Sequence, residues 1–326
     1  MKPQEPPDSL RTGVRKISIG EEYAGQRIDN YLRNLLSGVP KSRVYRLLRR
    51  GEVRVNGGRV QAAYKLQAWD LVRVPPVSMN APGPPPPDQP AADMLQRAIF
   101  EDKRLLVINK PAGVAVHGGS GISHGVIELL RASRPDLKDL ALVHRLDRET
   151  SGCLVLAKRR SALRELHEKF REGIVEKNYL ALAAGDWQHG DFLVKAPLLT
   201  DNRRNGDRHV VVDEAGKRAK TLISLSRTYG IFSLLQCRPL TGRTHQIRVH
   251  AQVMGHPLVI DQRYGDPDAN RQAKKMGLKR LFLHAQSIAF PDKSGNELHF
   301  TAPIADDLDH FLTHGLPARK SRRRKK

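Results

Sequence analysis

Apolar residues recur with a helical period near the start of the chain. The stretch "QRIDNYLRNLL" places them at the i, i+3, i+4, i+7 and i+8 positions that share one helix face. These positions are Ile28, Tyr31, Leu32, Leu35 and Leu36. The spacing predicts an amphipathic helix over residues 28–36.

A second helix is predicted directly after the first. The stretch "PKSRVYRLLRRG" begins with Pro40 and stops at Gly51, as the entry and exit signals of a helix should. One face is apolar and the opposite face is basic. The apolar face carries Val44, Leu47 and Leu48, and the basic face carries Arg43, Arg46 and Arg50.

A hairpin follows this helix. In "EVRVNGGRV", Val53 and Val55 alternate with polar residues as they would along a strand, and Asn56-Gly57 is the strongest short hairpin signal. Two helices and a small sheet therefore make up the first module, which we place at residues 15–75.

Strand-like apolar runs dominate the chain after residue 95. The clearest runs are "LLVINK", "CLVLAK", "KNYLALAAG", "TLISLS", "FSLLQCRPL" and "LFLHAQSIAF". Helical periods are fewer, chiefly in "GVIELLRAS" and "SALRELHEKF". Because strands and helices do not alternate strictly, the pattern argues against a doubly wound parallel sheet and favours a mixed α+β architecture.

Proline separates the two modules. Residues 75–90, "PPVSMNAPGPPPPDQP", contain eight prolines in sixteen positions, which favours an extended segment over helix or sheet. We predict a linker at 76–94 and a large domain at 95–314. Residues 1–14 and the basic tail at 315–326, which ends in "RKSRRRKK", are expected to be disordered.

Charge narrows the class of partner. The 56 Lys and Arg residues outnumber 34 Asp and Glu residues, which gives a formal charge of +22 and suits a polyanion such as nucleic acid. No apolar stretch approaches the roughly 18 residues of a membrane-spanning helix, so we expect no membrane partner. The first twenty residues lack the apolar core of a secretory signal, and the two cysteines form no CxxC pair, so we expect a cytoplasmic protein.

The first module is itself basic, with 14 basic and 5 acidic residues between positions 11 and 74. An isolated basic helix face is usually only solvated, but here the charge bias spans the whole module, which favours binding to RNA or DNA phosphates. The residues predicted to make these contacts are Lys41, Arg43, Arg46, Arg50 and Arg54.

One carboxylate lies among bases in "LVHRLDRETSGCLVLAK". Asp147 is flanked by His144, Arg145 and Arg148, just before a strand-like run. A carboxylate beside arginine gains charge-assisted hydrogen bonds and stays ionised when water is excluded, which suits a nucleophile or a general base. A structural ion pair is the alternative that the spacing leaves open.

Two further segments carry polar residues that could complete a site. In "TGRTHQIRVHAQVMGHPLVID", Arg243, His245 and Arg248 alternate with apolar residues, so a strand running into a short helix would present Arg243 or Arg248 inward. Tyr179 lies in an otherwise apolar strand, where a core tyrosine is the alternative. No HExxH motif or Cys/His set occurs, so we expect no metal site.

The motifs resemble two known families. The helix, helix, hairpin order of "QRIDNYLRNLLSGVPKSRVYRLLRRGEVRVNGGRV" is similar to the S4 RNA-binding domain, with Trp69 where that family usually has glycine. "HRLDRETSG" resembles the central signature of the RluA-type pseudouridine synthases. Their other motifs resemble, in the same order, "LLVINKPAGVAVHGG", "EKNYLALAAG" and "TGRTHQIRVHAQVMGHPLVIDQRYG", so the resemblance spans residues 12–314.

This resemblance implies an α+β fold with the mixed, largely antiparallel sheet of the pseudouridine synthases, behind an S4-like RNA-binding domain. It implies a cofactor-free isomerase in which Asp147 is the catalytic carboxylate, Arg248 is its salt-bridge partner, and Tyr179 stacks on a flipped uracil and assists proton removal at C5. The residues expected to bind substrate are His144, Arg145, Arg148, Arg243 and His245.

The resemblance also implies a substrate, large-subunit (23S) ribosomal RNA. Other ribosomal or transfer RNA uridines are an alternative target, and a catalytically silent ribosome-assembly factor or a metal-dependent nuclease is an alternative function. We expect a monomer. The charged stretch at 201–220 is either a hairpin that faces the substrate or a solvated insertion.

Overall fold

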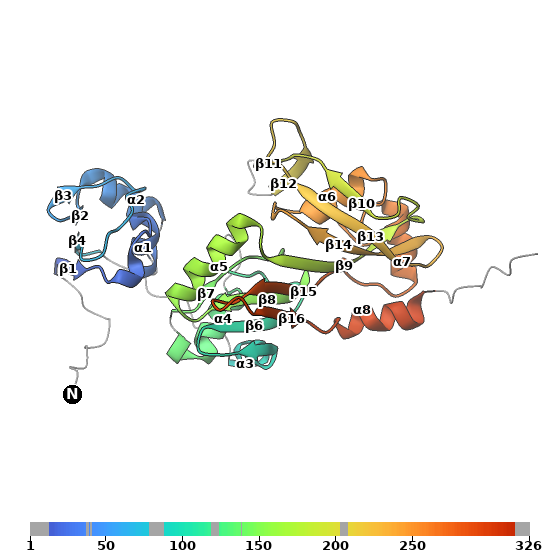
Figure 1. The fold of residues 1–326 in the computed structure, drawn as a ribbon, viewed down its shortest axis with the longest axis horizontal. Helices are drawn as coiled ribbons and strands as arrows, with labels where there is room; N and C mark the ends of the chain where they lie inside the picture. Colours follow the sequence, from blue (N-terminus) through green and yellow to red (C-terminus); the bar gives the residue numbers. More distant parts are fainter. Residues whose placement is uncertain are drawn as a thin grey trace, which may run out of the picture. The chain divides into compact units, whose positions relative to one another are not determined.

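The computed structural model describes residues 13–36, 39, 41–77, 88–118, 124–137, 139–202 and 208–316. The chain divides into two compact units, Met1–Pro85 and Pro86–Lys326 (Figure 1). The side chain of Lys41 and most of the predicted linker, tails and 203–207 loop lie outside the described residues. No helix in the described ranges has the length and hydropathy needed to span a bilayer.

The first unit is a small four-stranded antiparallel sheet with two helices on one face (Figure 1). Its strand order is β1-β4-β2-β3. In chain order the elements are β1 (Arg15–Ser18), η1 (Glu21–Tyr23), α1 (Ile28–Leu35), α2 (Lys41–Arg50), β2 (Arg54–Val55), β3 (Gly58–Arg59) and β4 (Leu71–Val74). Both predicted helices and the hairpin are therefore confirmed.

The core of this unit is formed by the apolar positions that predicted its helices. Ile28, Leu32 and Val44 are fully buried and pack with Val72 and Val74 of β4. The turn before β4 holds Trp69 in the left-handed region with φ of 70° and leaves its side chain 72% exposed. The structure thus keeps at Trp69 the backbone conformation that glycine adopts most readily.

The second unit contains one large sheet flanked by helices. Its first half comprises α3 (Asp88–Gln96), β5 (Ala98–Glu101), β6 (Leu105–Lys110), α4 (Val126–Ser133), η2 (Pro135–Leu137), β7 (Ala141–Leu142), β8 (Ser151–Ala157), α5 (Arg160–Glu172), β9 (Glu176–Ala184) and β10 (Phe192–Lys195). The rest comprises β11 (Leu198–Asn202), β12 (Arg208–Val212), β13 (Lys220–Thr228), β14 (Phe232–Pro239), α6 (Gln246–Val253), α7 (Pro267–Lys275), β15 (Leu283–Pro291), β16 (Glu297–Thr301), α8 (Asp306–His310) and η3 (Phe311–Gly315).

The large sheet is mixed and mainly antiparallel, which confirms the predicted fold class. Its ten strands follow the order β10-β13-β14-β9-β15-β8-β6-β5, with β16 beside β15 and β7 beside β8. The β8–β15 pair is parallel, and the other pairs of this sheet are antiparallel. The separate β11–β12 hairpin occupies part of the charged 201–220 stretch.

Helices cover both faces of the sheet around β6 and β8. Leu106 and Leu154 pack with α4 on one face, whereas Val107 and Val155 pack with α5 on the other (Figure 1). Successive strand residues point to opposite faces, so a strand covered on both sides must be apolar throughout. This explains why these two segments read as unbroken apolar runs.

Two local predictions were wrong. The helix α3 occupies part of the predicted 76–94 linker; Pro90 lies in its first turn, where the missing N–H has no intrahelical partner to lose. The segment expected to continue as a strand through Arg243 is instead a turn, because β14 ends at Pro239 and α6 begins at Gln246. The short helix expected after that strand is confirmed as α6, which carries Arg248.

Candidate active site

A cavity of about 760 Å³ opens in the second unit beside the strands at the centre of the large sheet. Five segments form its wall: the loop before β8, the C-terminal part of α5, the middle of β9, the turn that leads from β14 into α6, and the start of β15. Asp147, Tyr179, His245 and Arg248 all line it. The fold therefore brings together the residues that the sequence singled out in three separate motifs.

Asp147 lies in the loop between β7 and β8, and its side chain is 24% exposed. The buried Lys110, at the end of β6, holds the loop by hydrogen bonds. The Nζ of Lys110 donates to the carbonyls of Pro111, Val114 and Arg148 at 2.8, 2.8 and 3.1 Å. Gly113 N–H also donates to the Arg148 carbonyl at 2.9 Å. These bonds hold the backbone next to Asp147 in place.

Arg248 contacts two carboxylates in different ways. Its Nε and Nη2 donate to Asp261 at 2.6 and 2.8 Å, a bidentate pair buried in the protein. Its Nη1 lies 3.8 Å from Asp147 Oδ2. Burial alone would lower the pKa of Arg248, but the hydrogen bonds and charge of Asp261, together with the charge of Asp147, raise it. A permanent cation is therefore fixed beside Asp147.

His245 completes the surroundings of Asp147. Its Nε2 lies 4.0 Å from Asp147 Oδ2, and its Nδ1 lies 2.8 Å from the hydroxyl of Tyr264. That hydroxyl also accepts a hydrogen bond from Val210 N–H at 3.0 Å. Burial lowers the pKa of His245 to about 4, although the charge of Asp147 opposes the shift. His245 is therefore neutral at neutral pH.

Tyr179 provides an aromatic wall on β9. Burial, and then the charge of Asp147, raise the pKa of its hydroxyl, so the phenol stays protonated. Phe170 and Lys177 also line the cavity, and the Lys177 Nζ lies 5.8 Å from the centre of the Phe170 ring. Burial lowers the pKa of Lys177. The cavity thus combines aromatic surface with positive charge.

The bases next to Asp147 in sequence do not surround it in space. His144 lines the cavity, but its Nε2 accepts from Val155 N–H at 3.1 Å, and burial lowers its pKa to about 3, so it is uncharged. Arg148 is not among the lining residues; its Nε donates to the Gly113 carbonyl at 2.9 Å. Arg145 and Arg243 are exposed side chains at the cavity wall, in reach of an incoming polyanion.

The predicted RNA contacts of the first unit lie on two elements. Arg46 and Arg50 are exposed on α2, and Arg43 on the same helix is partly buried. Arg54 is exposed on β2, where its Nε donates to the Gly51 carbonyl at 3.2 Å. Lys41 and Arg43 both precede the buried Val44, but only the Arg43 side chain is among those described.

Asp261 and Tyr264 are the site residues that the sequence analysis missed. Both lie in "LVIDQRYG", which had been read only as part of a family motif. A signal was present, because an Asp that directly follows an apolar run is a candidate for a buried pair. The described residues contain no group of three or more His, Cys, Asp or Glu arranged to hold a metal ion.

Comparisons with known proteins agree with these features. The RNA pseudouridylate synthase family matches residues 104–253 and the S4 domain matches residues 26–72. The chain is 51% identical over 307 residues to the ribosomal large subunit pseudouridine synthase C of Pasteurella multocida, which covers 93% of this chain and 94% of that one. The protein of the same name from Escherichia coli K12 is 49% identical over 305 residues, covering 92% and 96%.

Solved structures show the same likeness over part of the chain. Human RNA pseudouridylate synthase domain containing 4 is 26% identical, with a TM-score of 0.59 over 70% of this chain and 95% of that chain. Human RNA pseudouridylate synthase domain containing 1 is also 26% identical, with a TM-score of 0.53 over 63% and 82%.

Proposed function

This chain belongs to the RNA pseudouridylate synthase family, and from that premise we propose that it isomerises particular uridines of large-subunit (23S) ribosomal RNA with Asp147 as the catalytic carboxylate. The target is inferred from relatives that share about half of their residues with this chain over nearly the full length. A cytoplasmic location and action as a monomer without a cofactor are parts of the same proposal.

The reaction is an isomerisation that protein side chains alone can support. The N1–C1′ bond of uridine breaks, the freed uracil rotates, and C5 joins C1′; a proton leaves C5 and N1 gains one, so no oxidant, reductant or water is consumed. An ionised carboxylate can start this by attacking C1′ or by removing a sugar proton. Both routes require a charged Asp147 whose oxygens are free.

The contact between Asp147 and Arg248 is the observation that carries the proposal. At 3.8 Å it is longer than a hydrogen bond, so the guanidinium stabilises the carboxylate charge without occupying its lone pairs. Arg248 is held at this distance because Asp261 takes its Nε and Nη2. Asp147 is therefore available to a ribose in the cavity, whereas Asp261 is fully engaged.

The cavity wall suits a uracil that has left its stack. The target nucleotide must be flipped out of folded RNA at a cost of about a few kcal/mol, and the detached base must then be retained. Tyr179 offers a ring for stacking on the base, and its raised pKa makes the hydroxyl a hydrogen-bonding group and proton relay rather than an anionic base at neutral pH. Arg145 and Arg243 would meet RNA phosphates at the cavity wall.

Asp147→Asn tests the assignment because it keeps the shape of the side chain and removes its charge. Ribosomal RNA from cells lacking this protein would be mapped for pseudouridine by carbodiimide adducts and primer extension, after complementation with wild type or variant. Stops that return with wild type and not with Asp147→Asn support the proposal. We expect the purified variant to bind RNA with wild-type affinity in filter binding.

The matched control is Asp191→Asn, an exposed carboxylate outside the cavity wall, which should restore every stop. Measurable turnover by purified Asp147→Asn would refute the catalytic role. If the ribosomal pattern is the same with and without the gene, the large-subunit target is wrong, and transfer RNA becomes the next substrate to map.

A further inference from the structure

The outer face of the sheet in the first unit carries four basic residues in one row. The strand register pairs Lys16 of β1 with Arg73 of β4, Arg73 with Arg54 of β2, and Arg54 with Arg59 of β3. Because the strand order is β1-β4-β2-β3, these residues are consecutive across the whole sheet. We call Lys16, Arg73, Arg54 and Arg59 the basic row.

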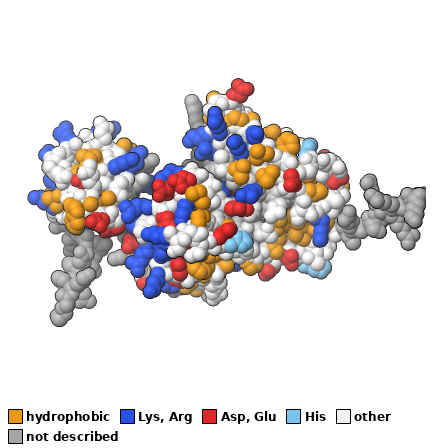
Figure 2. Space-filling view, in the orientation of Figure 1, with side chains coloured by type: hydrophobic (Ala, Val, Ile, Leu, Met, Phe, Trp, Pro, Cys, Tyr) orange, Lys and Arg blue, Asp and Glu red, His pale blue; other side chains and the backbone are white. Residues whose placement is uncertain are grey.

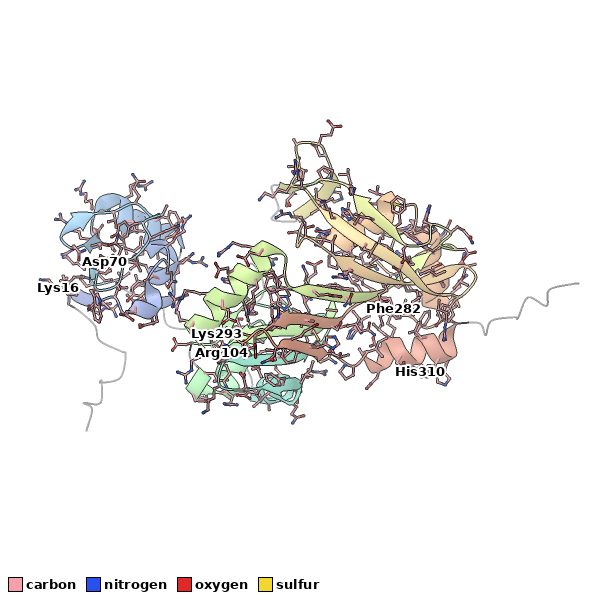
Figure 3. All side chains as sticks on the ribbon, in the orientation of Figure 1. Lys16, Asp70, Arg104, Phe282, Lys293 and His310 are labelled. Atoms are coloured by element: carbon pink, nitrogen blue, oxygen red, sulfur yellow. The ribbon has the colours of Figure 1, made fainter. Side chains whose placement is uncertain are left out.

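The row faces away from the apolar core. Along β4, Val72 and Val74 are buried against the helices, so Arg73 between them points outward. Lys16, Arg54 and Arg59 are exposed, and Arg73 is partly buried. Lys16 lies at the rim of the unit, whereas the buried Asp70 lies inside it (Figure 3). In the space-filling view, Lys and Arg side chains lie along the outline of this unit (Figure 2).

Such an arrangement is costly for a free sheet. Like charges directly opposite each other on neighbouring strands repel, and with strands about 4.8 Å apart the row places four cations within about 14 Å. No carboxylate lies within 4 Å of any of the four in the described parts of the chain. The described residues therefore leave this charge uncompensated.

Contacts with the backbone position the row without neutralising it. Arg73 Nη1 donates to the Glu52 carbonyl at 2.7 Å, and Arg54 donates to the Gly51 carbonyl at 3.2 Å. Arg59 lies over Gly51, where an added Cβ would approach its Nε to 2.5 Å. Neutral carbonyls orient the guanidinium groups and leave their full charge for a partner.

We propose that the basic row binds the phosphodiester backbone of RNA, as a surface additional to the arginine face of α2. A line of exposed cations matches a strand of phosphates, and arginine forms bidentate bonds to phosphate oxygens. The excess of 14 basic over 5 acidic residues in this part of the chain favours a polyanion over an acidic patch on another protein. The inference rests on RNA being the substrate, as in the proposed function.

The test is the salt dependence of RNA binding by the full-length protein. Lys16→Gln/Arg59→Gln removes two charges of the row and spares Arg54 and Arg73, whose bonds to carbonyls support the hairpin. The probe is an in vitro 23S ribosomal RNA transcript. Since each phosphate contact contributes about 0.7 to 0.9 to the slope of log K against log salt, we expect the slope to flatten by about 1 to 2 and the affinity at low salt to fall about tenfold.

Two controls separate the row from net charge and from folding. Lys274→Gln/Lys275→Gln removes the same charge from the exposed end of α7 and should leave the slope unchanged. Lys16→Arg/Arg59→Lys keeps the charge and should retain the wild-type slope, with thermal unfolding confirming that every variant folds. An unchanged slope for the row variant, or an equal loss in the α7 control, would overturn the proposal and leave an acidic protein as the class of partner for this face.

The proposed substrate can fail separately. Pseudouridine formation by wild type on the same transcript tests the target, whereas the slope tests only whether the row touches RNA. Suppose that wild type and the row variant differ in the slope of log K against log salt while wild type forms no pseudouridine in this transcript. That result would support the binding surface and contradict the 23S target.

Discussion

At the scale of single residues, Arg248 contacts two carboxylates. Asp261 holds it in place through two hydrogen bonds, and Asp147 lies at a longer distance from its third nitrogen. Asp261 accepts from two nitrogens of Arg248 and from the backbone N–H groups of Arg263 and Tyr264. Burial would raise the pKa of Asp261, but these hydrogen bonds and the charge of Arg248 lower it overall. Asp147 receives only a longer contact, which suits the residue proposed to do chemistry.

We predict that Asp261→Asn lowers both stability and turnover. The amide cannot accept both bonds from Arg248, so a buried cation loses its partner; the expected loss is about 3 kcal/mol of unfolding free energy and at least about tenfold in kcat, with RNA affinity retained. Urea unfolding and single-turnover kinetics would measure the two effects. Asp307→Asn breaks the same bidentate geometry with Arg280 at a half-exposed site, and should cost less than about 1 kcal/mol. Equal losses in the two variants would contradict the role of Asp261.

At the scale of elements, the loop that carries Asp147 takes its position from the end of β6. The chain from Ala141 to Ala157 leaves the sheet after β7 and returns as β8, with Asp147 in between. Lys110 bonds to the carbonyls of Pro111 and Val114, in the turn that follows β6, and to the carbonyl of Arg148 in the loop of Asp147. Two segments that are far apart in sequence are therefore held by one lysine side chain.

Lys110→Met should loosen that loop. The substitution keeps the apolar length of the side chain and removes the donor to the Pro111 and Val114 carbonyls, whereas the Arg148 carbonyl keeps its bond from Gly113 N–H. We expect a loss of about 3 kcal/mol in unfolding free energy and a drop in kcat. Calorimetry and pseudouridine formation would report the two losses. Lys195→Met, at the exposed end of β10, is the matched control and should change neither quantity. Wild-type turnover by Lys110→Met would show that the loop holds its place without the clamp.

At the scale of the whole molecule, the two units contribute different properties. The first unit has a compact core beneath an exposed basic face, and the second has the large sheet with the cavity. Several histidines of the second unit are buried in neutral form. Burial lowers the pKa of His144 to about 3 and of His245 to about 4, and it also lowers the pKa values of His250 and His284.

These histidines predict acid sensitivity. Unfolded histidine titrates near 6.5, so the folded state binds fewer protons; the stability is fully present above about pH 6.5 and is lost as pH falls toward the folded values of about 3 to 4. The urea concentration at the unfolding midpoint should decrease as the pH is lowered from 6.5 to 4.5. His144→Gln, whose amide oxygen can still accept from Val155 N–H, should reduce that fall, and the exposed His299→Gln should not. A midpoint independent of pH over this range would contradict the prediction.

Features with local causes were predictable from the chain. The helices α1 and α2 and the hairpin at Asn56-Gly57 follow from periodicity, helix end signals and turn chemistry. The strands β6 and β8 were predicted from their apolar runs, and the mixed α+β class from the order of those runs. Near Arg243 the local signal was ambiguous: the expected strand is a turn, whereas the expected short helix is present as α6.

The sequence by itself determined the family and the two modules, and it predicted Asp147 as the catalytic acid, because these depend on residue types and their spacing along the chain. Only the tertiary structure decided which bases face Asp147. Arg148 is its neighbour in sequence and turns away to Gly113, whereas His245 and Arg248 come from the start of α6 and the residue before it, about a hundred residues later. Proximity across a fold is set by sheet order and helix packing, and no local pattern encodes it.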